Sequence, residues 1–114
     1  MDALPIITAT YTVYKFLVEM NHHLEKRWKF SLGMSLENTA LSLLEQLIMA
    51  KHAPKSLKAS YLIKAVALLE VLRLKVRLLL ELKIANETKV FQMQNRLAEI
   101  GRMLGGWLKA ASSP

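Results

Sequence analysis

The sequence predicts an all-α protein that folds as an up-down-up-down antiparallel four-helix bundle. Apolar residues recur at helical spacing along nearly all of the 114 residues, and no alternating β-branched run extends beyond a few positions. Only three prolines and four glycines interrupt the chain, and the prolines lie where helices are expected to begin or end. Long helices that are joined by short connections must run antiparallel, so a bundle follows.

The first two helices are expected at residues 5–27 and 31–52. Pro5 suits the first turn of a helix, because a proline there loses no intrahelical hydrogen bond. Pro54 disfavours helical geometry at Ala53, so the second helix should end before it. The apolar stripes comprise Ile6, Ile7, Val13, Leu17, Met20 and Leu24 in the first helix, and Leu36, Leu43, Leu47 and Ala50 in the second.

The third and fourth helices are expected at residues 56–84 and 87–110, which completes a single domain over residues 1–114. Ser56 and Asn86 precede these helices and are candidate N-caps, since their side-chain oxygens accept from free backbone N–H groups. Glu87 favours the positive N-terminal end of the fourth helix.

The third helix has two apolar sides. One stripe suits a bundle core, and a second sector lies beyond Arg73 and Arg77 on the helical wheel. Leaving that sector in water would expose a patch of the kind that marks an interface, so we expect a homo-oligomer. The alternative is a helix central to its own bundle. The stripe comprises Leu62, Ala65, Leu69, Leu72, Val76 and Leu79; the second sector comprises Ala67, Leu68, Leu74, Leu78 and Leu82.

Three glycines fall within six positions of the fourth helix: Gly101, Gly105 and Gly106. Each glycine costs a helix about 1 kcal/mol relative to alanine, so their presence needs a compensating reason. Gly101 and Gly105 are four residues apart and share a face on which another helix can approach closely. Alternatively, Gly105 and Gly106 mark a kink or the helix end. A phosphate-binding loop is disfavoured because no strand precedes the glycines.

The net charge of +7 lies in the second half of the chain. Residues 1–53 carry five Lys/Arg and five Asp/Glu, whereas residues 54–114 carry eleven and four. A localised basic excess favours a polyanionic partner. The absence of cysteine excludes disulfides and thiolate metal sites. No secretory signal and no span of about 18 apolar residues is apparent, so a soluble, cytoplasmic protein without membrane attachment is expected.

The candidate nucleic-acid contacts are basic side chains in two regions. Arg73 and Arg77 lie one turn apart, and a guanidinium can donate two parallel hydrogen bonds to a phosphate. Alternatively, they form ion pairs with the nearby Glu70 and Glu81. Lys64, Lys75 and Lys83 extend the basic surface, although Lys64 and Lys75 point elsewhere on the wheel; Arg102 and Lys109 contact either solvent or a partner.

A second basic cluster, Lys26, Arg27 and Lys29, is interleaved with Trp28 and followed by Phe30. Basic and aromatic side chains together can bind single-stranded bases by stacking. The alternative, which we expect, is that Trp28 and Phe30 cap the bundle core while the charges stay solvated.

Catalytic and metal-binding patterns are absent from the sequence. Glu19 and His22 have the Glu-x-x-His spacing of di-iron bundles, but such sites need a second copy that this chain lacks. No nucleophile accompanies a base, and no paired carboxylates suggest a cleft. We therefore expect no enzymatic activity and no cofactor.

Three segments resemble the accessory variability determinant (Avd) family of diversity-generating retroelements: residues 99–109 (EIGRMLGGWLK), 72–78 (LRLKVRL) and 30–33 (FSLG). The resemblance implies a four-helix bundle that assembles into a homopentameric barrel. It also implies binding to nucleic acid, either template RNA or DNA, and to the reverse transcriptase in support of mutagenic retrohoming. Gly101, Gly105 and Trp107 of the first segment then join Leu74, Leu78 and Leu82 in the expected oligomer interface. Met34 and Ser35 depart from the polar or basic residues of the family.

Two other functions stay open from the sequence. The chain also resembles the four-helix proteins encoded in ribosomal RNA intervening sequences, so a structural adaptor that docks a protein partner through its spare apolar face is the alternative. Attachment to a membrane surface would need a basic amphipathic helix outside the bundle.

Overall fold

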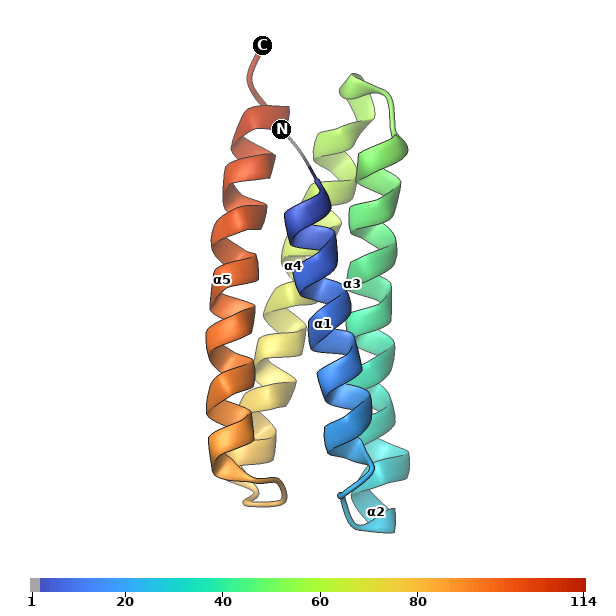
Figure 1. The fold of residues 1–114 in the computed structure, drawn as a ribbon. Helices are drawn as coiled ribbons and strands as arrows, with labels where there is room; N and C mark the ends of the chain where they lie inside the picture. The colour runs from blue at the N-terminus through green and yellow to red at the C-terminus, as the bar shows by residue number, and fades with distance from the viewer. Residues whose placement is uncertain (1–2) are drawn as a thin grey trace.

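Four long helices follow the long axis of the molecule, each antiparallel to the next in the chain (Figure 1). The structure, a computed structural model, describes residues 3–114 and contains no strand within them. It measures 48 × 21 × 19 Å. The predicted helical bundle is therefore confirmed. The elements are α1 (Leu4–Asn21), α2 (Lys26–Trp28), the π-helix η1 (Lys29–Gly33), α3 (Met34–His52), α4 (Lys55–Glu81) and α5 (Glu87–Ala111).

The core lies between four helices that contact one another in a ring. α3 packs against α1 and α4, and α5 packs against α4 and α1. The α4 stripe that the sequence assigns to the core, from Leu62 to Leu79, is buried throughout. Removing such side chains from water contributes roughly 25 cal/mol per Å² of apolar surface and is the main force that holds the helices together. From α5 the core receives Val90, Met93, Leu97, Ile100, Leu104 and Trp107.

The first helix ends at Asn21, so the predicted end at residue 27 is wrong. The Asn21 side chain is 2% exposed, and its Nδ2 donates to the Gly33 carbonyl and to the Glu37 carboxylate, both at 2.8 Å. These bonds tie the end of α1 to the start of α3 and force the chain to turn. Leu24 is buried as its spacing predicts, but it lies in the turn and not in the helix.

The second long helix begins earlier than residue 31. The chain is already helical at Lys26, where α2 starts, and continues through η1 into α3. A π-helix has one residue more per turn than an α-helix and therefore shifts the faces of its residues. Gly33 closes this turn, and a Cβ there would lie 3.1 Å from the Trp28 carbonyl oxygen and 3.2 Å from Asn21 Cγ. The tight approach explains why glycine occupies the position.

The two ends of α4 differ in part from the predicted helix bounds. Ala53 is extended, as predicted, but the N-cap position of α4 is Pro54 and not Ser56. α4 ends at Glu81, before the predicted residue 84, because Lys83 adopts a left-handed conformation with φ 56°. The N–H of Ile84 then donates to the Leu79 carbonyl at 3.2 Å, which satisfies the helix end.

The α5 cap agrees with the sequence. The Asn86 side-chain oxygen accepts from the Lys89 N–H at 3.0 Å, so the predicted N-cap is confirmed. Glu87 lies in the first turn beside this cap, where the helix dipole favours a negative charge.

Lys58 closes the C-terminus of α3. Its Nζ donates to the carbonyls of Ala50 at 2.8 Å and Lys51 at 3.0 Å, which have no partner within the helix end. Lys58→Met is expected to lower the free energy of unfolding by about 1–2 kcal/mol, because charged hydrogen bonds at a helix C-terminus are lost. Chemical denaturation measures the loss. Lys55→Met, at an exposed position in the first turn of α4, is the control and should be neutral or slightly stabilising; equal losses in both variants would contradict this role for Lys58.

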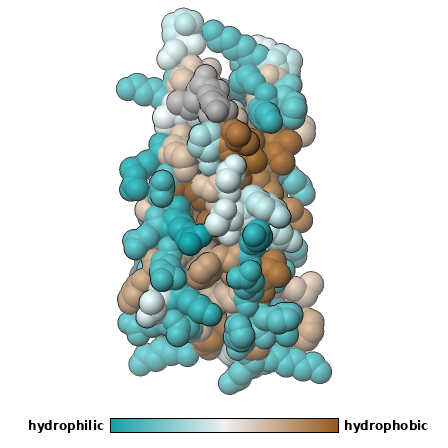
Figure 2. All heavy atoms as spheres, in the orientation of Figure 1, coloured by the Kyte–Doolittle hydropathy of each residue, from teal (hydrophilic) through white to brown (hydrophobic). Residues whose placement is uncertain are grey.

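Apolar side chains also reach the outer surface away from α4. Figure 2 shows hydrophobic atoms gathered on the side of the molecule where α1 and α3 lie, with hydrophilic atoms around them. Four exposed side chains on these helices are Tyr11, Val18, Leu41 and Ile48. Among the described residues, no helix combines the length and the apolar character that crossing a membrane requires.

Candidate functional site

An open groove runs along the outside of the bundle between α4 and α5. It has a volume of about 940 Å³, and its apolar walls include Leu69 and Leu74 of α4 and Leu104 and Leu108 of α5. Polar side chains line the same groove, namely Glu70, Arg73, Arg77, Gln94 and Asn95. The groove therefore combines an apolar surface with hydrogen-bonding groups on both helices.

Arg73 and Arg77 both line this groove, as their one-turn spacing on α4 requires. Arg77 Nε lies 3.5 Å from Glu81 Oε1, and the two side chains are 64% and 57% exposed. An exposed pair of this kind contributes only about 0–1 kcal/mol, so it leaves Arg77 available to a phosphate. Glu70 and Arg73, which both belong to the described residues, form no ion pair with each other. Of the two alternative ion pairs, one is present.

Gly101 and Gly105 place the α5 backbone at the wall of the groove. A Cβ at Gly101 would lie 3.6 Å from Leu69 Cδ2 and 3.8 Å from an Arg73 guanidinium nitrogen, so Gly101 packs close to α4 of the same chain. A Cβ at Gly105 would meet no atom within 4 Å. Gly105 is therefore not required by packing within the subunit, and the space beside it is open to a second molecule. α5 continues without a break through both glycines to Ala111.

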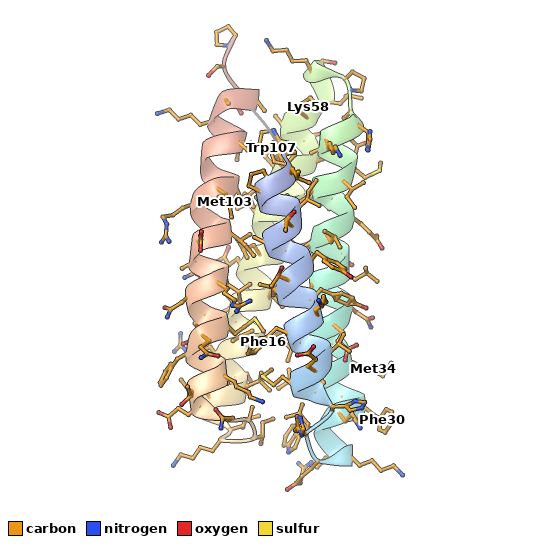
Figure 3. The ribbon with its side chains drawn as sticks, viewed as in Figure 1. Phe16, Phe30, Met34, Lys58, Met103 and Trp107 are labelled. Carbon is orange, nitrogen blue, oxygen red and sulfur yellow. The ribbon has the colours of Figure 1, made fainter. Side chains whose placement is uncertain are left out.

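The predicted apolar sector of α4 is on the surface. Leu74, Leu78 and Leu82 are 57%, 39% and 42% exposed, respectively. Trp107 belongs elsewhere, because it is 5% exposed and extends from α5 into the core (Figure 3). The sequence assigns Trp107 to an oligomer interface, and its burial within the subunit corrects that assignment. Its side chain fills the end of the bundle near Ala3 and Lys58.

The remaining basic candidates do not join Arg73 and Arg77 in the α4–α5 groove. Lys75 lies in a different groove, between α3 and α4, where its Nζ donates to Thr39 Oγ1 at 2.8 Å. The Lys64 ammonium lies 5.8 Å from the centre of the Tyr61 ring, and Lys83 lies in the turn between α4 and α5. Lys26 and Arg27 lie in α2. The candidate basic residues thus belong to separate surfaces, as the helical wheel predicts for Lys64 and Lys75.

The sequence predicts that Trp28 and Phe30 cap the bundle core, and the structure contradicts this prediction for Phe30 but not for Trp28. Trp28 is partly buried and packs against the core, whereas Phe30 is 62% exposed. The sequence also missed Gln94 and Asn95 as groove residues. A helical wheel of α5 places Gln94 within about 20° of both Gly101 and Gly105, so the sequence held a signal for Gln94 but none for Asn95.

No metal-binding cluster is present among residues 3–114. No three His, Cys, Asp or Glu side chains in this part of the chain lie close enough together to hold a metal ion. Glu19 and His22, which have the di-iron spacing, are both exposed at the end of α1. The α4–α5 groove therefore offers binding chemistry through cations, amides and apolar surface.

A family model described as bAvd-like matches residues 7–111, which includes all but the first turn of the bundle. The chain belongs to the bAvd-like family. The resemblance to the accessory variability determinants that the sequence motifs carry is thereby confirmed. None of the curated proteins compared with the chain matches it. In this bAvd-like chain, the walls of the α4–α5 groove include Gly101 and Gly105, which belong to residues 99–109, one of the three segments that carry the resemblance.

Proposed function

We propose that this bAvd-like chain is a non-enzymatic accessory protein of a diversity-generating retroelement. It assembles into a homo-oligomer of five subunits, binds nucleic acid and binds the reverse transcriptase of the element. The observation that supports the proposal best is the open groove of α4 and α5, where Arg73 and Arg77 lie beside exposed leucines and the unoccupied space at Gly105.

Assembly and nucleic-acid binding support each other in this proposal. Leu74 lines the same groove as the two arginines, so a second copy that covers the exposed leucines brings further arginines close by. Several weak phosphate contacts on one particle raise the affinity for a long polyanion without new chemistry. The net charge of +7 per chain adds a favourable long-range attraction.

Replacing Arg73 and Arg77 together with alanine tests the nucleic-acid site. The double variant is expected to bind RNA at least roughly tenfold more weakly at low salt, since each charged hydrogen bond contributes about 1.5–3 kcal/mol. The slope of log affinity against log salt should fall by about 1.4–1.8, because two phosphate contacts no longer release counterions. Fluorescence anisotropy with labelled RNA gives both values, and circular dichroism checks the fold.

The control for this experiment is Lys51→Ala with Lys55→Ala, which removes the same charge at exposed positions outside the α4–α5 groove. This pair should reduce the affinity much less. An arginine double variant that binds RNA as tightly as the wild-type protein would refute the assignment of Arg73 and Arg77. Copurification with the reverse transcriptase of the same element tests the protein partner separately.

A structural adaptor is the second candidate function, and the apolar residues on α1 and α3 favour it. Tyr11, Val18, Leu41 and Ile48 are exposed on α1 and α3, whereas both groove arginines lie on α4. The affinity for a protein partner that docks there should depend little on salt concentration. The affinity for a nucleic acid should fall as the salt concentration rises.

A further inference from the structure

Phe30 is the most exposed large apolar side chain among the described residues, at 62%. It projects away from the bundle near the end where α1 meets α3, and Met34 lies beside it on the next turn (Figure 3). Burying a phenylalanine ring is strongly favourable, so an aromatic side chain this exposed needs a reason beyond folding.

The backbone holds Phe30 in this outward position. Phe30 lies within the five-residue π-helix η1, whose extra residue per turn shifts the side chain away from the core-facing positions. Two contacts fix the turn: Asn21 Nδ2 donates to the Gly33 carbonyl, and Ser31 Oγ donates to the Arg27 carbonyl, each at 2.8 Å. The exposed ring is thus attached to an ordered element.

Basic residues precede this ring along the chain. Lys26, Arg27 and Lys29 are three of the four residues before Phe30, and Glu25, the residue before them, is acidic. The Arg27 guanidinium carbon lies 4.6 Å from the centre of the Trp28 ring, within the range of a cation–π contact, and a guanidinium has five N–H donors for hydrogen bonds. The surface therefore offers the exposed Phe30 ring and phosphate-binding cations within about one turn.

A groove of about 410 Å³ between α3 and α4 begins at Phe30 and Met34. Its walls carry hydroxyl and amide groups from α3, including Ser35 and Asn38, and Lys75 lies among them. Lys75 donates to Thr39 Oγ1, and an ammonium has three donors, so two remain for a ligand. Small polar side chains of this kind form hydrogen bonds with base edges and sugar oxygens.

We propose that η1 and the adjoining α3–α4 groove form a binding site for single-stranded nucleic acid, separate from the arginines of the α4–α5 groove. One base stacks on the Phe30 ring, Lys26, Arg27 and Lys29 bind the neighbouring phosphates, and Asn38 with Lys75 contacts the strand in the groove. A duplex does not fit this chemistry, because its base faces are covered by their neighbours. The inference rests on the proposed nucleic-acid function and specifies the form of nucleic acid that is bound.

Phe30→Ala tests the site with oligouridylate and oligothymidylate of about fifteen nucleotides as probes. Loss of one stacked base is expected to weaken binding of both probes roughly fivefold or more, with an unchanged salt slope, while duplex binding stays the same. Phe30→Leu should behave like Phe30→Ala, since it keeps an apolar side chain but no ring, and Phe30→Tyr should bind like wild type. Phe91→Ala is the matched control, because Phe91 is also exposed, at 45%, but lies on α5.

Tryptophan fluorescence gives an independent measurement. The chain has two tryptophans, and Trp28 belongs to the proposed site whereas Trp107 is buried near the other end of the bundle. Oligouridylate should quench the emission of the wild-type protein, and Trp28→Phe should abolish the quenching while binding persists.

The outcomes separate this site from the general function. Wild-type binding of the single-stranded probes with no loss in Phe30→Ala would overturn the site and leave the Arg73 and Arg77 proposal standing. Loss of reverse transcriptase binding in Phe30→Ala, with RNA binding intact, would show a protein-docking surface and would also overturn it. Failure of the wild-type protein to bind any RNA in dilute buffer would overturn both proposals.

Discussion

Leu74→Gln combined with Leu78→Gln is expected to convert the proposed homo-oligomer into a monomer. The two leucines are 57% and 39% exposed on α4, and neither is needed for the core of the subunit. Glutamine has a helix propensity close to that of leucine, so α4 should stay helical while its apolar surface is lost. Full burial of an exposed leucine contributes about 1.5–3 kcal/mol, and the exposed parts of Leu74 and Leu78 together amount to about one leucine. Losing both therefore changes the dissociation constant roughly tenfold or more. Analytical ultracentrifugation at micromolar concentration measures the result.

Leu41→Gln with Ile48→Gln is the comparison for this experiment. These residues are 38% and 41% exposed on α3, so the pair removes a similar kind of surface from a different face. The α3 variant should remain assembled. Dissociation of the α3 variant, together with intact assembly of the α4 variant, would move the interface to the α1–α3 side.

Gly33→Ala is expected to lower the free energy of unfolding by about 1–2 kcal/mol, against the usual trend for glycine in a helix. The new Cβ would lie 3.1 Å from the Trp28 carbonyl oxygen and 3.2 Å from Asn21 Cγ. Neither neighbour moves easily, because one is a backbone carbonyl at the end of α2 and the other is a buried amide with two hydrogen bonds. Thermal and chemical unfolding measure the loss, and hydrogen exchange should show faster opening of residues 26–33.

Gly105→Ala is the matched control, with the opposite sign. No atom lies within 4 Å of a Cβ at this exposed helical position, so alanine should stabilise the subunit by up to about 1 kcal/mol. Both glycine variants are measured in the Leu74→Gln, Leu78→Gln background, which removes any effect of assembly. A Gly33→Ala protein that is as stable as Gly105→Ala would show that the η1 turn relaxes around the methyl group.

The α1–α3 connection shows where sequence reasoning reaches its limit. The apolar spacing of α1 continues to Leu24, and this residue is buried, so the pattern itself is read correctly. The helix nevertheless ends at Asn21, because its amide reaches Gly33, twelve residues further along the chain. Such a bond depends on where α3 lies and leaves no periodic signal. The exposure of Phe30 follows from the same turn.

The placement of the basic residues has a similar explanation. The helical wheel correctly separates Lys75 from Arg73 and Arg77, because all three lie on one regular helix. It does not say which neighbour covers each side of α4. The structure places α5 beside the arginines and α3 beside Lys75, so the two sets belong to different grooves.

The sequence by itself determined the helical bundle, the core stripe of α4, the Asn86 cap, the exposure of Leu74 and Leu78, and membership of the bAvd-like family. The helices, the stripe and the cap depend on residues within about one or two helical turns of each other, where spacing and propensity act directly, and the family match depends on the sequence of residues 7–111. Only the tertiary structure decided the turn at Asn21, the outward position of Phe30, the burial of Trp107 and the division of the cations between two grooves. These depend on which helices lie side by side, and that arrangement is set by packing between segments distant in the sequence.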